Sequence, residues 1–272
     1  MVNTEKARTA SHWTPDWPVT IYDKRVKGET PMAKPVAPRN GAMANSDSVR
    51  EVDSFLQSMA MMPTPSAGQR GRLIFAMDAT ASREPTWDIA CDIQAEMFAE
   101  TDTLGGLEVQ LVFYRGIGEC RSTKWLSCSN DLVDRMVKVR CLGGRTQVGR
   151  VLKHAVKEAR KASVGALVLV GDAFEEAIDP VCEIAGQLGL LGTRAFLFQE
   201  GDNPEARRAF RQIARLTGGA CCRFDAGSAR QLRDLLSAVA VYAAGGRQAL
   251  ENFAGSRGGA ARQITSQISG KD

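Results

Sequence analysis

Apolar residues form two alternating kinds of segment along the chain. The first kind is a short, almost continuous apolar run, found at residues 73–77, 107–114, 166–170, 194–198 and 220–224. The second kind is mostly longer and carries apolar residues at helical intervals, at residues 84–100, 131–139, 147–161, 178–188, 204–217 and 228–244. Continuous apolar runs are typical of parallel strands covered on both faces. A shorter edge strand is expected at residues 123–126.

This alternation predicts an α/β fold: a doubly wound, mostly parallel sheet with helices on both faces. We expect this Rossmann-like domain to span residues 71–246. Residues 1–44 are rich in proline and are expected to form an extended or disordered arm, followed by a helix and linker at residues 45–70. Residues 247–272 are rich in glycine, alanine and serine and are expected to form a flexible tail.

Composition narrows the classes of function. The 272 residues carry a net charge of +4, which by itself does not indicate a nucleic-acid partner. The seven cysteines show no CxxC spacing and the chain has two histidines, so reduced thiols are expected rather than a zinc cluster. No apolar stretch approaches the ~20 residues that cross a bilayer, and the N-terminus does not resemble a secretory signal. We therefore expect a cytoplasmic protein without a membrane partner.

The candidate chemistry lies where two of the predicted strands end. Asp78, Thr80 and Ser82 follow the first apolar run at alternate positions, and an extended chain turns alternate side chains in the same direction. Thr146 follows a Gly-Gly turn, and Asp172 follows the apolar run at residues 166–170. Carboxylate and hydroxyl oxygens suit a hard divalent cation. Strand ends of a doubly wound sheet are also where such folds bind ligands.

Each of these residues also has an ordinary structural interpretation. Ser82 can cap the next helix, and Thr146 can cap the helix that follows it. Asp78 can accept backbone N–H groups in its turn, and Asp172 can orient a loop. Taken singly, each of these interpretations is preferable, but together the residues favour a metal site.

Two glutamates follow the second carboxylate closely. Glu175 and Glu176 can add negative potential near the cation or pair with Arg145 or Arg83, but a solvated loop is the preferred interpretation. Arg145 lies inside the glycine turn, where its guanidinium can bind a carboxylate or phosphate of a partner or form a local ion pair.

The spacing of the oxygen-bearing residues resembles the von Willebrand factor type A (VWA) domain and its metal-ion-dependent adhesion site (MIDAS). The family pattern is Asp-x-Ser-x-Ser, then a Thr after a Gly-Gly turn, then an Asp after a later strand. This sequence reads Asp78-x-Thr80-x-Ser82, then Thr146, then Asp172, with threonine in place of the first serine. Many members continue with glycine after the last aspartate, whereas this chain continues with alanine. The resemblance covers roughly residues 71–246.

The resemblance implies a role for each of the five residues. Thr80 and Ser82 would coordinate Mg²⁺ (or Mn²⁺ or Ca²⁺) directly, and Asp78 would accept hydrogen bonds from bound water. Thr146 would ligate directly or through water, and Asp172 would anchor the opposite side. The partner would be another protein that supplies a Glu or Asp to the open coordination position.

The sequence thus predicts a non-enzymatic, metal-dependent protein-interaction or scaffold module. No Ser-His-Asp or Cys-His set is evident, and His154 is expected on a helix surface away from the motif. One alternative is a Mg²⁺-dependent phosphoryl-transfer hydrolase with Asp78 as nucleophile, although Thr80 stands where such enzymes carry a second acid. Another alternative is an RNA-associated VWA protein, since nucleic acid is unlikely from the charge but not excluded.

Overall fold

The computed structural model describes residues 70–101, 104–225 and 229–256. Six strands form one sheet in the order β3-β2-β1-β4-β5-β6. All neighbouring strands pair in parallel except β3, which runs antiparallel to β2. The expected arm, the expected helix and linker up to residue 69, and the tail beyond residue 256 lie outside the described residues.

The strands match five of the six sequence predictions closely. Their bounds are β1 (Gly71–Asp78), β2 (Leu107–Arg115), β3 (Glu119–Ser122), β4 (Ala166–Gly171), β5 (Arg194–Glu200) and β6 (Ala220–Phe224). Side chains of β1 alternate between the two faces, and both faces are buried. Leu73, Phe75 and Met77 enter one apolar cluster, while Ile74 and Ala76 enter the other.

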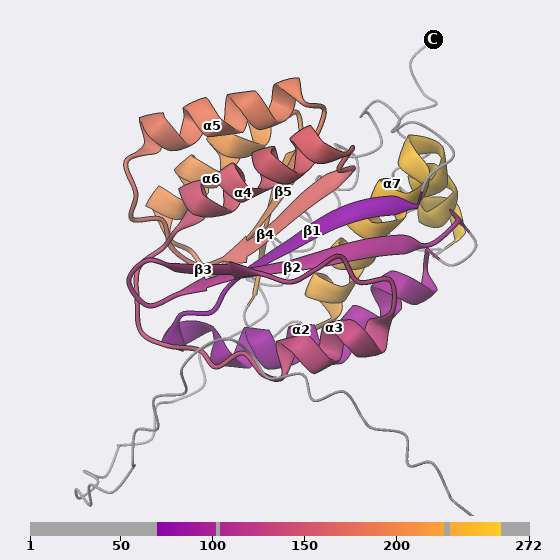
Figure 1. Ribbon diagram of the computed structural model, residues 1–272, viewed down its shortest axis with the longest axis horizontal. Coiled ribbons are helices and arrows are strands. Elements are labelled where there is room, and N and C mark those ends of the chain that lie inside the picture. Colours follow the sequence, from indigo (N-terminus) through magenta and orange to yellow (C-terminus); the bar gives the residue numbers. More distant parts are fainter. Residues whose placement is uncertain (1–69, 102–103, 226–228, 257–272) are drawn as a thin grey trace, which may run out of the picture. The chain divides into compact units, whose positions relative to one another are not determined.

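Helices cover both faces of the sheet, as the sequence predicts (Figure 1). On one face lie α2 (Glu84–Ala99), α3 (Ser129–Met136) and α7 (Ala229–Ser256). On the other lie α4 (Val148–Lys161), α5 (Ile178–Leu190) and α6 (Pro204–Leu216). A short 3-10 helix, η1 (Ala81–Arg83), joins β1 to α2. The predicted doubly wound fold is therefore confirmed.

The edge strand differs from the sequence prediction. Instead of residues 123–126, the earlier segment β3 forms this strand, and Leu126 only makes an isolated antiparallel bridge with Val109. A tight turn with positive φ at Gly116 and Gly118 returns the chain directly onto β2. The hairpin register is therefore set by turn geometry, and the polar residues of β3 give no apolar pattern by which to find it.

The last helix continues beyond the expected domain boundary at residue 246. Helical backbone extends to Ser256, with a kink at Gly246, whose φ of 69° lies in the left-handed region that glycine tolerates. Beyond the kink, Ala249 and Leu250 are buried, which explains why the chain stays helical there. The tail expected from residue 247 thus begins with an ordered segment. None of the helices in the described part of the chain is long and apolar enough to cross a bilayer.

Candidate metal site

The two aspartates lie at the carboxyl ends of neighbouring strands. Asp78 is the last residue of β1, and Asp172 directly follows β4; the two strands pair in parallel with Met77 opposite Val170. Because β2 and β4 flank β1 on opposite sides, the chain changes direction across the sheet at this point. A crevice outside the strand ends at such a switch point is the usual ligand site of a doubly wound sheet.

Three oxygen-bearing side chains meet beyond the ends of β1 and β4, a position that we call the crevice. The Ser82 hydroxyl donates a hydrogen bond to Asp172 Oδ2 at 3.1 Å, although the two residues are far apart in the sequence. The Thr80 and Ser82 hydroxyls lie 3.4 Å from each other. The β1 loop and the β4 loop are therefore joined through the side chains that the sequence selects as ligands.

Asp78 lies deeper, at the base of the same crevice. Its side chain is only 1% exposed, and its Oδ1 accepts the N–H of Thr80 at 2.7 Å. Its Oδ2 is buried and has no hydrogen-bond partner among the described residues. Burial raises the pKa of Asp78 to about 6; hydrogen bonds from Thr80 oppose the rise, and the nearby charge of Asp172 adds to it. A buried carboxylate oxygen without a partner is unfavourable, and a bound cation would compensate it.

Thr146 is joined to the Asp172 loop indirectly. Its N–H donates to Glu175 Oε2 at 3.1 Å, and its hydroxyl accepts the backbone N–H of Glu175 at 2.9 Å. These two bonds hold the start of α4 against the segment that follows β4. In the ranges that the structure covers, no direct hydrogen bond joins the Thr146 side chain to the other four predicted ligands.

The glycine turn before Thr146 packs closely on the β2–β3 hairpin. A Cβ placed on Gly144 would lie 2.3 Å from both the backbone N and O of Gly116, whereas one on Gly143 would meet nothing within 4 Å. The N–H of Arg145 donates to the Gly116 carbonyl at 3.1 Å. Only one of the two glycines is therefore required for the close approach that positions the Thr146 loop.

The expectation that Glu176 lies in a solvated loop is wrong. Both of its carboxylate oxygens accept backbone N–H groups at the start of α4, from Val148 and from Gly149, the latter at 3.0 Å to Oε2. No side chain caps α4 locally, since Gln147 makes no cap bond, so a distant acid satisfies these N–H groups. Burial raises the pKa of Glu176, opposed by these backbone hydrogen bonds.

The sequence analysis does not predict the buried ion pair that lies next to Thr80 and Ser82. Arg83 follows Ser82, is 1% exposed, and forms an ion pair with Glu200 at the end of β5. The Thr86 hydroxyl donates to the same carboxylate. The suggested pairing of Arg83 with the glutamates after Asp172 is therefore wrong. The pair fixes the loop that carries the two hydroxyls to the far side of β4.

Tyr114 lies opposite Asp78 on the neighbouring strand β2. It ends the apolar part of β2 and is fully buried, and its hydroxyl makes no hydrogen bond of regular geometry in the described part of the chain. Burial raises the pKa of Tyr114 far above its usual value, and the charge of the Asp78 carboxylate and its hydrogen-bonding interaction with the tyrosine hydroxyl raise it further. A Cβ on Gly171 would lie 3.5 Å from this hydroxyl and 3.9 Å from Asp78 Cβ. The tyrosine therefore lies beside the candidate ligands, where its apolar strand context gives no hint of a polar role.

Comparisons with known proteins bear on the fold. No family model and no curated protein matches the sequence. Among solved structures, a von Willebrand factor type A protein from Catenulispora acidiphila matches at 18% identity with a TM-score of 0.52, over 64% of this chain and 43% of that one. Proximal thread matrix protein 1 from the mussel byssus, with a zinc-occupied MIDAS motif, matches at 17% identity with a TM-score of 0.52, over 63% and 48%.

The chain has the VWA fold. The SpaC pilus adhesin from Lactobacillus rhamnosus GG also matches, at 12% identity with a TM-score of 0.51, over 70% of this chain and 31% of that one. Each of these three alignments spans less than half of the solved chain. At such identities the likeness shows the architecture of the fold alone.

The donor set at the strand ends of this VWA-like fold suits a hard cation. Across the described ranges no three histidine, cysteine or carboxylate side chains are grouped to hold a metal ion, so a site here depends on hydroxyls as well as carboxylates. The crevice combines the acids Asp78 and Asp172 with the hydroxyls of Thr80 and Ser82. Oxygen donors of this kind match Mg²⁺, Mn²⁺ or Ca²⁺ better than a thiophilic metal. Among the described residues Asp78 Oδ2 accepts no hydrogen bond of regular geometry, and such an ion would compensate its charge.

Proposed function

We propose that this VWA domain is a metal-dependent protein-interaction module. A divalent cation, Mg²⁺ in the first instance, is held by Asp78, Thr80, Ser82, Thr146 and Asp172. The observation that carries the proposal is that Asp78 Oδ2 is buried and has no hydrogen-bond partner among the described residues. Hydroxyls and a second carboxylate linked by hydrogen bonds lie in the same crevice.

The ligand set indicates what kind of partner would bind. Two protein carboxylates and neutral hydroxyls do not over-neutralise a divalent ion, so an open coordination position on it can still take a further anionic oxygen. A Glu or Asp of a partner protein meets this requirement. Arg145 is exposed in the adjoining loop, and its guanidinium is suited to a second carboxylate of the same partner.

The proposal is for a binding module rather than an enzyme. A hydrolase that used Asp78 as nucleophile would need an acid two positions later, and the hydroxyl of Thr80 cannot act as a general acid near neutral pH. His154 does not lie at the carboxyl ends of the strands. Its ring nitrogen Nε2 is 2.8 Å from Oε1 of Gln110, which is in the middle of β2. Mg²⁺-dependent turnover of a phosphate ester that is lost on Asp78→Asn would overturn this part of the proposal.

Metal-dependent thermal stability tests the proposal. A cation that binds only the folded state at 100 times its Kd stabilises that state by about 2.7 kcal/mol. We expect MgCl₂ or MnCl₂ to raise the Tm of the parent protein relative to EDTA. Asp78→Ala and Asp172→Ala should abolish the rise, whereas Asp134→Ala, which removes a carboxylate on α3 outside the crevice, should retain it. Equal responses in parent and both crevice variants would exclude these ligands.

A further inference from the structure

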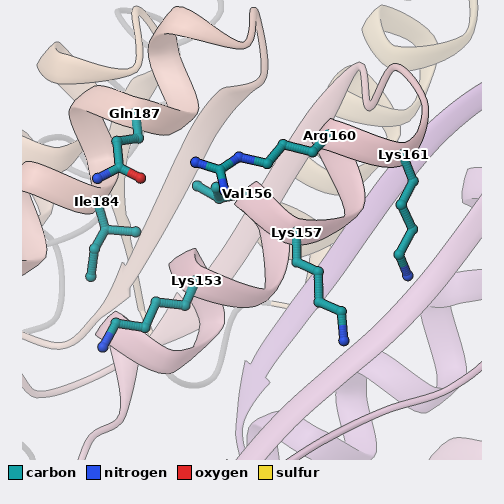
Figure 2. A pocket seen from close by; sticks show the side chains of 7 residues that line it. All are labelled: Lys153, Val156, Lys157, Arg160, Lys161, Ile184 and Gln187. Carbon is teal, nitrogen blue, oxygen red and sulfur yellow. The ribbon is translucent and has the colours of Figure 1, made fainter.

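A hollow between α4 and α5 lies outside the candidate metal site. Its volume is about 440 Å³, and its lining residues all come from these two helices (Figure 2). Those from α4 are Lys153, Val156, Lys157, Arg160 and Lys161, and those from α5 are Ile184 and Gln187. The lining belongs to the middle and C-terminal half of α4, whereas the metal crevice adjoins the start of that helix. We call this hollow the α4–α5 groove.

The groove is lined by several cations, three of which form no direct ion pair in the described ranges, although Lys153 lies close enough to Glu176 to oppose the rise that burial causes in the pKa of that carboxyl. Within the described residues, Lys153, Lys157 and Arg160 form no ion pair, and their side chains make no hydrogen bond. By contrast, Lys161 pairs with Glu158 at 2.6 Å. The helix has one acid, Glu158, against its several basic residues. Cations gathered around a hollow raise the local concentration of anions and direct their approach.

The spacing of the cations indicates the size of a matching ligand. Lys153 and Arg160 are seven residues apart, which places them on one face of α4, two turns or about 10 Å from each other. In Figure 2 the guanidinium of Arg160 extends toward the side of the groove where Gln187 lies. Val156, which is 6% exposed, and the half-buried Ile184 supply apolar surface along the groove. The groove thus offers two cations separated by apolar surface.

We propose that the α4–α5 groove binds an acidic amphipathic helix of a partner protein, independently of the metal. A helix with carboxylates at positions i and i+7 reproduces the spacing of Lys153 and Arg160. Apolar residues at i+3 and i+4 would then contact Val156 and Ile184, as in other helix-in-groove complexes. The Gln187 amide provides a neutral donor and acceptor at the edge of the groove.

A protein partner fits the groove better than nucleic acid does. Single-stranded nucleic acid is usually held by aromatic side chains on which bases stack, and α4 and α5 contain no phenylalanine, tyrosine or tryptophan. The apolar surface of Val156 and Ile184 instead suits aliphatic side chains. The net charge of +4 over 272 residues does not by itself favour a polynucleotide partner.

A designed peptide provides the probe. The peptide is helical and fluorescein-labelled, with glutamates at i and i+7 and leucines at i+3 and i+4, and its binding is followed by fluorescence anisotropy in EDTA and about 50 mM salt. We expect saturable binding that the double variant Lys153→Glu/Arg160→Glu weakens about tenfold or more, because attraction becomes repulsion at both contacts. Ile184→Asp should weaken binding as well.

A matched variant separates this effect from net charge. Arg208→Glu/Arg211→Glu makes the same charge change on α6, away from the groove lining, and should leave the peptide affinity within about twofold of the parent. Circular dichroism and urea unfolding verify that all variants are folded. Binding in EDTA distinguishes the groove from the metal crevice, so failure of one proposal leaves the other standing.

Three results would overturn the inference. The first is absence of saturable peptide binding to the parent protein. The second is equal binding of a peptide of the same composition whose glutamates lie on different helix faces. The third is a U-rich RNA dodecamer that binds more tightly than the peptide and loses affinity in the same groove variant, which would identify the groove as a nucleic-acid site.

Discussion

Replacing Asp78 with asparagine should stabilise the metal-free protein near pH 7.5 and abolish its response to metal. Asparagine has nearly the same shape, keeps an oxygen acceptor for the Thr80 N–H, and carries no charge. The carboxylate it replaces is almost completely buried and has one oxygen without a partner among the described residues. The variant therefore removes an unfavourable buried charge while preserving the surrounding turn.

The size of the effect follows from the pKa of Asp78. Its rise from 3.8 to about 6 on folding is a difference of about two pH units, which corresponds to about 3 kcal/mol of unfavourable free energy once the group is ionised. The buried amide N–H groups of asparagine should cost about 1 kcal/mol of this gain. A net stabilisation of about 2 kcal/mol is expected at pH 7.5 in EDTA.

The pH dependence has a defined sign. The folded state binds the Asp78 proton more tightly than the unfolded state, so this group does not lower stability below pH 3.8. The parent loses stability relative to the variant as the pH rises from about 4 to about 6. Below pH 4 the advantage of Asp78→Asn should vanish. Comparing the two proteins at each pH cancels the titration of groups that do not interact with Asp78.

Urea unfolding in EDTA and in saturating MgCl₂ measures both effects. In MgCl₂ the order should reverse, because the parent gains the binding free energy of the ion and the variant does not. The control Asp134→Asn changes an acid on α3 outside the crevice and should differ little from the parent under any of these conditions. A variant that is less stable than the parent in EDTA at pH 7.5 would refute the reasoning about the buried charge.

Three further changes test the structure around the crevice. Glu176→Ala should lower the free energy of unfolding by about 1–2 kcal/mol in urea, because the first N–H groups of α4 lose their acceptor; a fall below about 0.3 kcal/mol would contradict the capping role. Gly144→Ala should cost about 1–3 kcal/mol and reduce the metal-induced rise in Tm, whereas Gly143→Ala should be nearly neutral; equal effects would contradict the close packing. Arg83→Met should destabilise by about 3–5 kcal/mol, and adding Glu200→Leu should restore most of the loss, since a lone buried charge is worse than none.

The strands could be predicted from the sequence because burial on both faces imposes continuous apolar runs. β6 lies where the apolar run at residues 220–224 places it, and β1 extends its run by only a few residues. The prediction for β3 is wrong because its four residues, Glu119–Ser122, carry no apolar period. Its position depends on the glycine turn and on pairing with β2, which are properties of the folded hairpin.

The site could be predicted only in part from the sequence, because several of its contacts join residues that are far apart along the chain. Asp78, Thr80 and Ser82 are recognisable because alternate positions of one extended segment share a direction. The partnership of Arg83 with Glu200 depends on β5 ending beside the β1 loop, and no local pattern encodes it. The cap that Glu176 gives to α4 depends in the same way on tertiary approach.

Anomalous scattering from crystals grown with MnCl₂ would show directly whether a metal ion binds between Asp78 and Asp172. We expect one strong anomalous peak in the crevice between these two residues, within coordination distance of the Thr80 and Ser82 hydroxyls and with Thr146 at its edge. We also expect that the same crystals soaked in EDTA lose the peak. A fully ordered crevice without a peak, or manganese bound only elsewhere on the molecule, would contradict the proposed metal site.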